Sequence, residues 1–220
     1  MAGIQIFGSH GLFQIDGTYR NLALRSKLTV NTTSSLGASL GSVTDVLNLP
    51  TGTTTPVIAV RGGTNAATVY WLNVGTGQYQ VMTNAPVGTS LTIYVFAESA
   101  PSTSGSGLQV FDASGAVVFD SMQKYMRVAG IVVSSALGQS VALPSGRAYA
   151  LAVTGGFYSN AVAVPVSQYQ NYQLRYAGRM PNATTAELFG VALHVSVSAN
   201  PATSTTANNA CLLAIDVTDY

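Results

Sequence analysis

The chain carries the same short motif twice, and this repeat limits what it can fold into. GIQIFGSHGLFQID begins at Gly3 and GLQVFDASGAVVFD begins at Gly107, a shift of 104 positions. Under this shift the identical pairs are Gly3 and Gly107, Gln5 and Gln109, Phe7 and Phe111, Gly11 and Gly115, and Asp16 and Asp120. An internal repeat of this kind favours an architecture with two similar halves.

Each copy of the motif is predicted to form a β-hairpin. In the second copy, two apolar runs flank the loop from Asp112 to Gly115. An aspartate can start such a turn by accepting backbone hydrogen bonds, and a closing glycine can adopt the positive φ that other residues resist. The first copy has Gly-Ser-His-Gly at 8–11 in the same place.

The repeat continues beyond the hairpin, since PTGTTTPVIAVRGG at 50–63 resembles PSGRAYALAVTGG at 144–156. We therefore expect an all-β chain with little or no helix, built from two tandem, related β-sandwich-like domains. These domains would span 1–102 and 107–220, with a Ser/Gly linker at 103–106. The alternative is one larger sandwich with pseudo-symmetric halves.

The rest of the sequence also favours strands. Short runs rich in β-branched and aromatic residues are separated by clusters of Gly, Pro, Asn and Ser, which is typical of sandwiches and barrels. The segment 34–47 could hold one helical turn, but its glycines disfavour a helix. The clearest predicted strands are 69–74, 78–83, 91–97, 148–153, 172–177 and 191–199.

Charge is scarce, and this excludes some classes of function. Charged residues make up 8% of the chain and the formal net charge is +1, whereas about 25% charged residues is usual. With no basic stripe, sequence-independent binding of nucleic acid is not expected. No apolar run is long enough for a membrane span. A surface rich in hydroxyls and amides suits a protein held in an assembly, and also a lectin-like module.

No candidate for catalysis or metal binding has the context that its chemistry needs. Residues 37–41 (GASLG) match G-x-S-x-G without the strand and helix that should flank it. His10 and His194 lack nearby Cys or carboxylate partners at metal-ligand spacing. Cys211 lies in an apolar run and is expected to be a buried thiol. We expect no enzymatic activity, no cofactor and no metal.

A tyrosine-rich stretch is the best candidate for a binding face. It spans 157–176 and mixes tyrosines with Asn and Gln, a composition suited to glycans or adaptable protein contacts. The alternative is that these tyrosines alternate on a strand and cover the core. The candidate receptor or glycan face comprises Tyr158, Tyr169, Tyr172 and Tyr176.

The second copy of the motif, GLQVFDASGAVVFDSMQKYMRV at 107–128, resembles the opening of small structural proteins of tailed bacteriophages, which are encoded near tail-tip and tail-fibre genes. The first copy departs from that pattern, with Gly8, Gly17 and Ala23 in place of the turn Asp, the Ser and the Arg. The matching residues are Gly107, Leu108, Val110, Phe111, Asp112, Gly115, Phe119, Asp120, Ser121, Arg127 and Val128.

The resemblance implies a virion protein of the tail tip, baseplate or fibre that acts in host attachment without catalytic residues. Its expected partners are other tail proteins, further copies in a symmetric trimer or ring, and a host pilus or surface glycan. Synthesis in the bacterial cytoplasm without a signal peptide, followed by incorporation into the tail, is expected. The hairpin residues expected to make assembly contacts are Phe7, Asp16, Phe111, Asp112, Phe119, Asp120 and Arg127.

Other functions stay open at the level of sequence. A head or tail decoration or scaffolding protein without a receptor role would share the low charge and the β-rich halves. A free carbohydrate-binding module should bind sugar as a monomer through the tyrosines. A depolymerase would need a pair of carboxylates flanking the glycosidic bond, and nothing in the sequence points to such a pair.

Overall fold

The computed structural model describes the fold of most of the chain. The described residues are 6–7, 13–15, 21–36, 41–49, 56–62, 69–98, 106–154, 157–164, 168–198 and 209–220. All regular structure in these residues is β, without a helix, so the prediction of an all-β fold is confirmed. The candidate helical turn within 34–47 contains two short strands instead, β4 (Ser34–Ser35) and β5 (Ser42–Val43).

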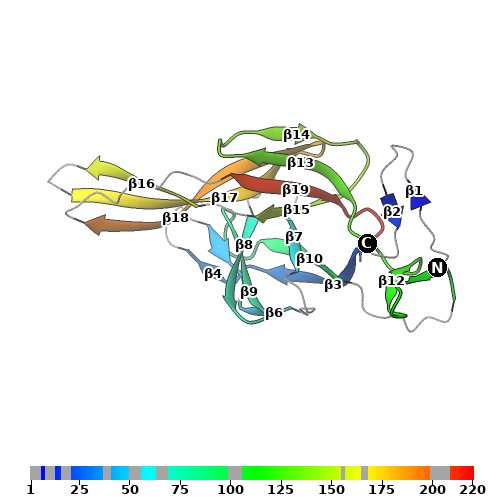
Figure 1. Cartoon of the computed structure of the whole chain (residues 1–220). Coiled ribbons are helices and arrows are strands. Elements are labelled where there is room, and N and C mark those ends of the chain that lie inside the picture. Colours follow the sequence, from blue (N-terminus) through cyan, green and yellow to red (C-terminus); the bar gives the residue numbers. More distant parts are fainter. Residues whose placement is uncertain are drawn as a thin grey trace.

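The strands form two large sheets and two separate hairpins (Figure 1). The six-stranded sheet has the order β13 (Val128–Ser134), β19 (Ala210–Asp216), β15 (Tyr149–Thr154), β7 (Val57–Arg61), β10 (Ser90–Glu98) and β3 (Leu22–Asn31). The nine-stranded sheet has the order β14 (Ser140–Ala142), β18 (Thr185–Ser198), β17 (Gln168–Asn182), β8 (Val69–Gly75), β9 (Gln78–Thr83), β5 and β4, with β16 (Phe157–Val164) on β17 and β6 (Leu47–Asn48) on β9. The hairpins are β1 (Ile6–Phe7) with β2 (Phe13–Ile15), and β11 (Gln109–Phe111) with β12 (Val117–Asp120).

The six runs predicted as strands correspond to β8, β9, β10, β15, β17 and β18. These runs could be recognised because strand-forming residues and the turn residues between them act locally.

Both large sheets take strands from both sides of the predicted domain boundary. In the six-stranded sheet the halves meet where β7 pairs with β15, at Val60 and Leu151. In the nine-stranded sheet they meet where β8 pairs with β17, at Val69 and Gly178. Strands from before and after the predicted boundary at 103–106 therefore lie together in both large sheets. Of the predicted linker 103–106, only Ser106 is described.

The strand pairing repeats with the same shift as the sequence motif. In the first half β3 pairs with β10, and a bulge leaves Arg25 unmatched between Ser26 and Leu24. In the second half β13 pairs with β19, and a bulge leaves Ala129 unmatched, 104 positions later. The hairpins agree as well, since Phe7 pairs with Phe13 and Phe111 with Val117. The two halves are thus alike in register and not only in sequence.

Each half has its own core between the two sheets. In both halves the six-stranded sheet has apolar side chains on the face toward the nine-stranded sheet, at alternate positions along its strands. In the first half the core combines β7, β10 and β9; its buried residues are Leu49, Ile58, Val60, Tyr79, Val81, Leu91, Ile93 and Val95. In the second half it combines β13, β15, β19, β17 and β18; its buried residues are Val132, Leu143, Tyr149, Leu151, Tyr176, Ala186, Leu188, Ala210, Leu212 and Ala214.

A third cluster on the opposite face of the six-stranded sheet spans both halves. Its large members, Tyr94, Phe96 and Ile215, surround small residues at the junction of β7 with β15. The buried residues of this cluster are Ala59, Tyr94, Phe96, Ala150, Ala152, Ile215 and Val217. The halves are therefore held together by packing as well as by strand pairing.

Gly178 lies in β17 where this strand pairs with β8, and the two sheets are close together at this position. A Cβ atom there would lie 2.8 Å from Cδ1 of Leu212 and 3.0 Å from Cδ1 of Leu151, both in the second core. Contacts this short require the neighbouring side chains to shift, so the position is restricted to glycine by packing.

We predict that Gly178→Ala lowers the free energy of unfolding by about 1–3 kcal/mol through overpacking, measured by urea denaturation. Gly75→Ala is the matched control, because a Cβ at that strand residue would meet mainly the flexible end of Gln78. Equal, small effects of the two substitutions would contradict the packing argument.

Candidate functional site

Two regions contain most of the residues that the sequence marked as candidates. One is the motif hairpin, residues 107–122, formed by β11 and β12. The other is the arm, formed by β16 and by the parts of β17 and β18 that pair next to it. The two regions project from opposite ends of the sandwich (Figure 1).

Asp112 organises the turn of the motif hairpin, as the sequence predicted. Its Oδ1 accepts hydrogen bonds from the backbone N–H of Ser114 at 2.8 Å and of Ala116 at 2.9 Å. The Ser114 hydroxyl donates to the same oxygen at 2.6 Å. Gly115 closes the turn with a φ of 84°, in the left-handed region that glycine tolerates best. The first copy has Gly8 in place of this aspartate, at a position outside the described residues.

Asp120 and Phe119 hold the base of the hairpin. The Asp120 carboxylate is fully buried and accepts from Gln109 Nε2 at 2.9 Å and from the N–H of Met122 at 2.8 Å. The Phe119 ring stacks on Tyr125, with ring centroids 5.0 Å apart. The Tyr125 hydroxyl also accepts the N–H of Asp120 at 2.6 Å. These motif residues make contacts inside the hairpin that hold its base together.

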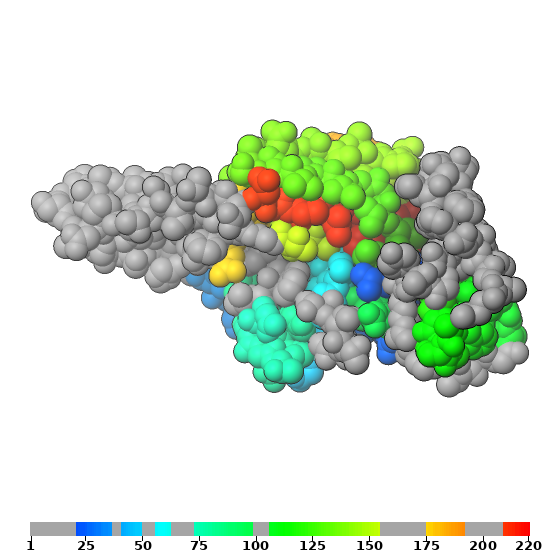
Figure 2. All heavy atoms as spheres, in the orientation of Figure 1, coloured from blue at the N-terminus to red at the C-terminus, as the bar shows by residue number. Residues whose placement is uncertain are grey.

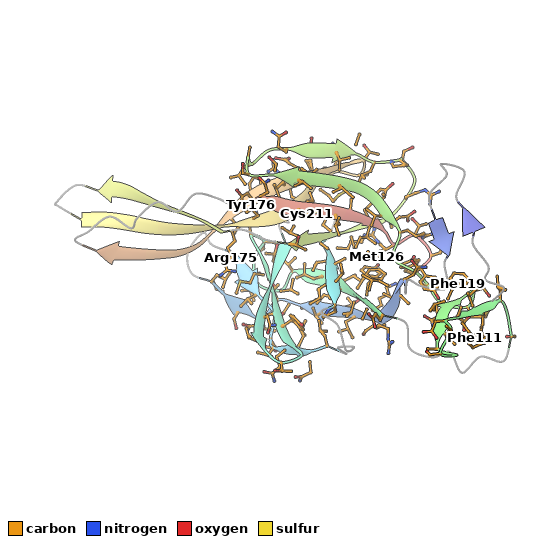
Figure 3. All side chains as sticks on the ribbon, viewed as in Figure 1. Phe111, Phe119, Met126, Arg175, Tyr176 and Cys211 are labelled. Carbon is orange, nitrogen blue, oxygen red and sulfur yellow. The ribbon has the colours of Figure 1, made fainter. Side chains whose placement is uncertain are left out.

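Three large apolar side chains of the hairpin lie at the surface. Leu108 is 46% exposed, Phe111 51% and Met122 62%. Figure 3 shows Phe111 and Phe119 on the hairpin, at the end of the molecule away from the arm. Of these three exposed residues the sequence had singled out only Phe111 for contacts. Leu108 and Met122 carried no signal, because their exposure depends on how the hairpin leaves the sandwich.

Arg127, the last polar residue of the motif, anchors the C-terminal segment, and its side chain is half exposed. Its Nη2 donates to the backbone oxygen of Thr218 at 2.6 Å and lies 3.5 Å from Oδ1 of Asp216. Its guanidinium also lies over the Tyr220 ring, 4.8 Å from the centroid. The equivalent residue of the first half is Ala23, which is buried. The departure of the first copy from the motif is therefore a loss of this anchor.

Asp216 is the charged centre of that anchor. It is buried and also accepts from Arg147 Nη1 at 2.6 Å. Burial alone would raise the pKa of the Asp216 carboxyl, but hydrogen bonds from Thr218 and Arg147 and the charge of Arg127 outweigh it and hold the pKa below its usual value. The ionised form of Asp216 is thus favoured by folding.

The arm contains three of the four candidate tyrosines, although only its backbone is described there. In the pairing of β16 with β17, Tyr158 is opposite Leu174, Asn160 is opposite Tyr172 and Ala163 is opposite Tyr169. Successive positions of a strand belong to opposite faces of a sheet. Positions 169 and 172 therefore belong to different faces, so these tyrosines do not form one continuous row.

Tyr176 does not belong to an exposed face, which corrects the prediction for this residue. It is 5% exposed and packs in the core of the second half, with its hydroxyl donating to the backbone oxygen of Ser135 at 2.7 Å. Strand β17 begins in the arm and continues into the main part of the nine-stranded sheet, and Tyr176 lies where it enters the sandwich (Figure 3).

The other predicted positions can be placed only in part. Phe7 lies in β1, opposite Phe13. Asp16, His10 and the Ser/Gly segment 37–40 lie outside the described residues, and His194 is placed only as a residue of β18. Cys211, expected in the core, lies in β19 and is partly exposed, because it points away from the inter-sheet core.

The described part of the chain contains no group of three His, Cys, Asp or Glu residues arranged to hold a metal ion. Within the same residues there is also no apolar helix of the length that a membrane crossing requires.

We predict that the contribution of Asp216 to stability depends on pH. Because the folded pKa is lowered, the stabilisation is present above the ordinary carboxyl pKa and is lost as the pH falls through the folded value. Asp216→Asn should therefore lower the free energy of unfolding by about 1–2 kcal/mol near neutral pH, and by less in acid. The effect is limited to this size because both arginine partners of Asp216 are half exposed to solvent.

Urea denaturation of the wild type and of Asp216→Asn at several pH values would measure this difference. The control is Asp219→Asn, which changes an exposed carboxyl of the same segment and leaves the hydrogen bonds of Asp216 in place. A cost of Asp216→Asn that stays constant down to strongly acidic pH would contradict the prediction.

Comparison with protein-family models, with curated proteins and with solved structures gives no match for this chain. The likeness of 107–128 to phage structural proteins therefore stays a prediction from the sequence. What the geometry adds is the division of that motif into internal supports and exposed apolar side chains.

Proposed function

We propose that this protein is a non-catalytic structural component of a tailed-phage virion, in the tail tip, baseplate or fibre, that takes part in host attachment. The observation that supports this most is the motif hairpin. Its carboxylates, Asp112 and Asp120, accept hydrogen bonds within the hairpin. The apolar side chains of Leu108, Phe111 and Met122 are exposed and available for contact with a neighbouring protein.

A hairpin of this kind suits docking on another protein. The bonds of Asp112 and Asp120 fix the backbone before any partner arrives, so little conformational entropy is lost on binding. Phe111 provides a rigid aromatic anchor, and the flexible thioether of Met122 can adapt to an irregular surface. In this proposal the motif hairpin joins the protein to a neighbouring tail subunit.

The arm is the part assigned to the host in this proposal. It lies at the end opposite to the hairpins (Figure 1), so a protein held at one end would present the other outward. Tyr158, Tyr169 and Tyr172 are its tyrosines, and tyrosine offers both a flat apolar surface and a hydroxyl to a glycan or pilus. Tyr176 is left out of this surface because it is buried.

We predict that Phe111→Ser combined with Met122→Ser prevents incorporation of the protein into tailed particles without unfolding it. The substitutions remove apolar contact area from residues that are already exposed, so the melting temperature should change little. Complementation of a phage lacking the gene, followed by mass spectrometry of purified particles, measures incorporation. Val46→Ser is the control, since Val46 is another exposed apolar residue outside the hairpin.

Immunogold labelling of wild-type particles tests the location separately. Label at the distal end of the tail is expected. Label on the head or along the tail tube would contradict a tail-tip role and favour decoration, and a particle without the protein would reject the virion proposal.

The host-facing role has its own measurement, the competition of purified protein with phage for host cells. Wild-type protein should slow adsorption, and Tyr158→Ala with Tyr172→Ala should weaken that effect. Wild-type protein that neither slows adsorption nor binds cells would remove the attachment role and leave scaffolding.

A further inference from the structure

Strand β13 forms one outer edge of the six-stranded sheet, and among the described strands it pairs only with β19. Three of its apolar side chains are at the surface: Val128 is 43% exposed, Ile131 56% and Val133 62%. Figure 2 shows this strand as a green band on the surface, next to the red atoms of β19. An exposed apolar edge strand is a ready template for pairing with another chain.

The opposite edge of the same sheet shows that this exposure is not a requirement of the fold. The shift of 104 positions that relates the halves places Lys27 where the second half has Ile131, and Thr29 where it has Val133. Lys27 and Thr29 are exposed as well, so the two sites have similar access to solvent. A polar edge and an apolar edge thus occupy equivalent backbone positions.

The edge of β3 is protected against pairing, whereas the edge of β13 is not. β3 carries the exposed cations Arg25 and Lys27. Its first residues are also covered, since Ala23 forms a bridge with Tyr125. By contrast, the sequence VAGIVVS of β13 contains no charged residue and no proline. Charge and coverage are the usual means of preventing edge pairing, and β13 has neither along these seven residues.

We propose that β13 pairs antiparallel with β13 of a second copy of this chain about a two-fold axis, which continues the six-stranded sheet across the dimer. This proposal does not depend on the virion role. A two-fold axis brings the same patch of both copies together, so each Ile131 and Val133 would lie beside apolar residues of the other copy.

The distribution of charge favours pairing of β13 with β13 of a second copy over head-to-tail pairing of β13 with β3. Pairing of β13 with itself brings no like charges together, because the strand has none. Pairing of β13 with β3 of another copy would place the cations Arg25 and Lys27 on a strand that pairs with an apolar one, and would leave open edges at both ends of the assembly. The chain itself already joins two edges in antiparallel fashion, where β7 meets β15.

The pairing surface is small, since seven strand residues span roughly 24 Å. A dimer held mainly by one strand pair is at the small end of specific interfaces and should be in equilibrium with monomer. The expected observation for the full chain is therefore a shift from monomer to dimer with rising concentration in sedimentation velocity, without larger species.

The repeat supplies the test variant. Ile131→Lys with Val133→Thr gives β13 the residues that β3 has at the equivalent positions, so the fold should tolerate them and the melting temperature should hold. We expect this variant to weaken the dimer roughly ten-fold or more. Thr29→Lys is the matched control on the protected edge, and it should dimerise like the wild type. Hydrogen exchange at β13 should slow with concentration, while exchange at β3 should not.

Several results would overturn the proposal. A wild-type chain that stays monomeric at all concentrations would mean that a different partner covers β13. A dimer unaffected by the β13 substitutions, or one that protects other strands from exchange, would place the interface elsewhere. A ladder of growing species would indicate head-to-tail pairing.

Discussion

The junction of β7 with β15 is the interaction on which the rest of the structure depends. Each half contributes three strands to the six-stranded sheet, and without the junction β7 and β15 would expose unpaired backbone groups at an edge. The junction also brings Ala59 and Ala152 into one cluster with Tyr94 and Phe96. The small side chains leave room for the large rings, so pairing and packing support each other at the same place.

Local chemistry explains what could be predicted from the sequence. The strands from β8 to β10 follow from runs of β-branched and aromatic residues, and the turn at Asp112 follows from a side chain that bonds its own backbone. The joining of the halves was not predictable in this way. It depends on the pairing of β7 with β15, whose residues are about 90 positions apart in the sequence, and the local runs of strand-forming residues do not specify which distant strands become neighbours.

The same difference between local and long-range interactions explains which features of the candidate site could be predicted. The phage-like motif is defined by residues that shape a hairpin, so Asp112, Asp120 and Arg127 turned out to bind within the chain. Tyr176 was misplaced because β17 passes from the arm into the core without a change in composition that would mark the crossing. Burial is a property of the packed molecule, and the sequence around Tyr176 does not differ in composition from the stretch of β17 that precedes it.

Equivalent positions of the two halves are apolar in both halves inside the sandwich, but differ in polarity at its surface. Phe96 and Ile215 occupy equivalent positions by register, and both are fully buried, since the core admits only apolar residues there. On the surface the fold sets no such requirement, so a difference between equivalent positions has to come from something other than folding. Where the first half has the charged Lys27, the second half has Ile131, an apolar side chain whose exposure to water is unfavourable. The apolar edge of β13 is therefore the feature by which the proposed self-pairing would distinguish the second half from the first.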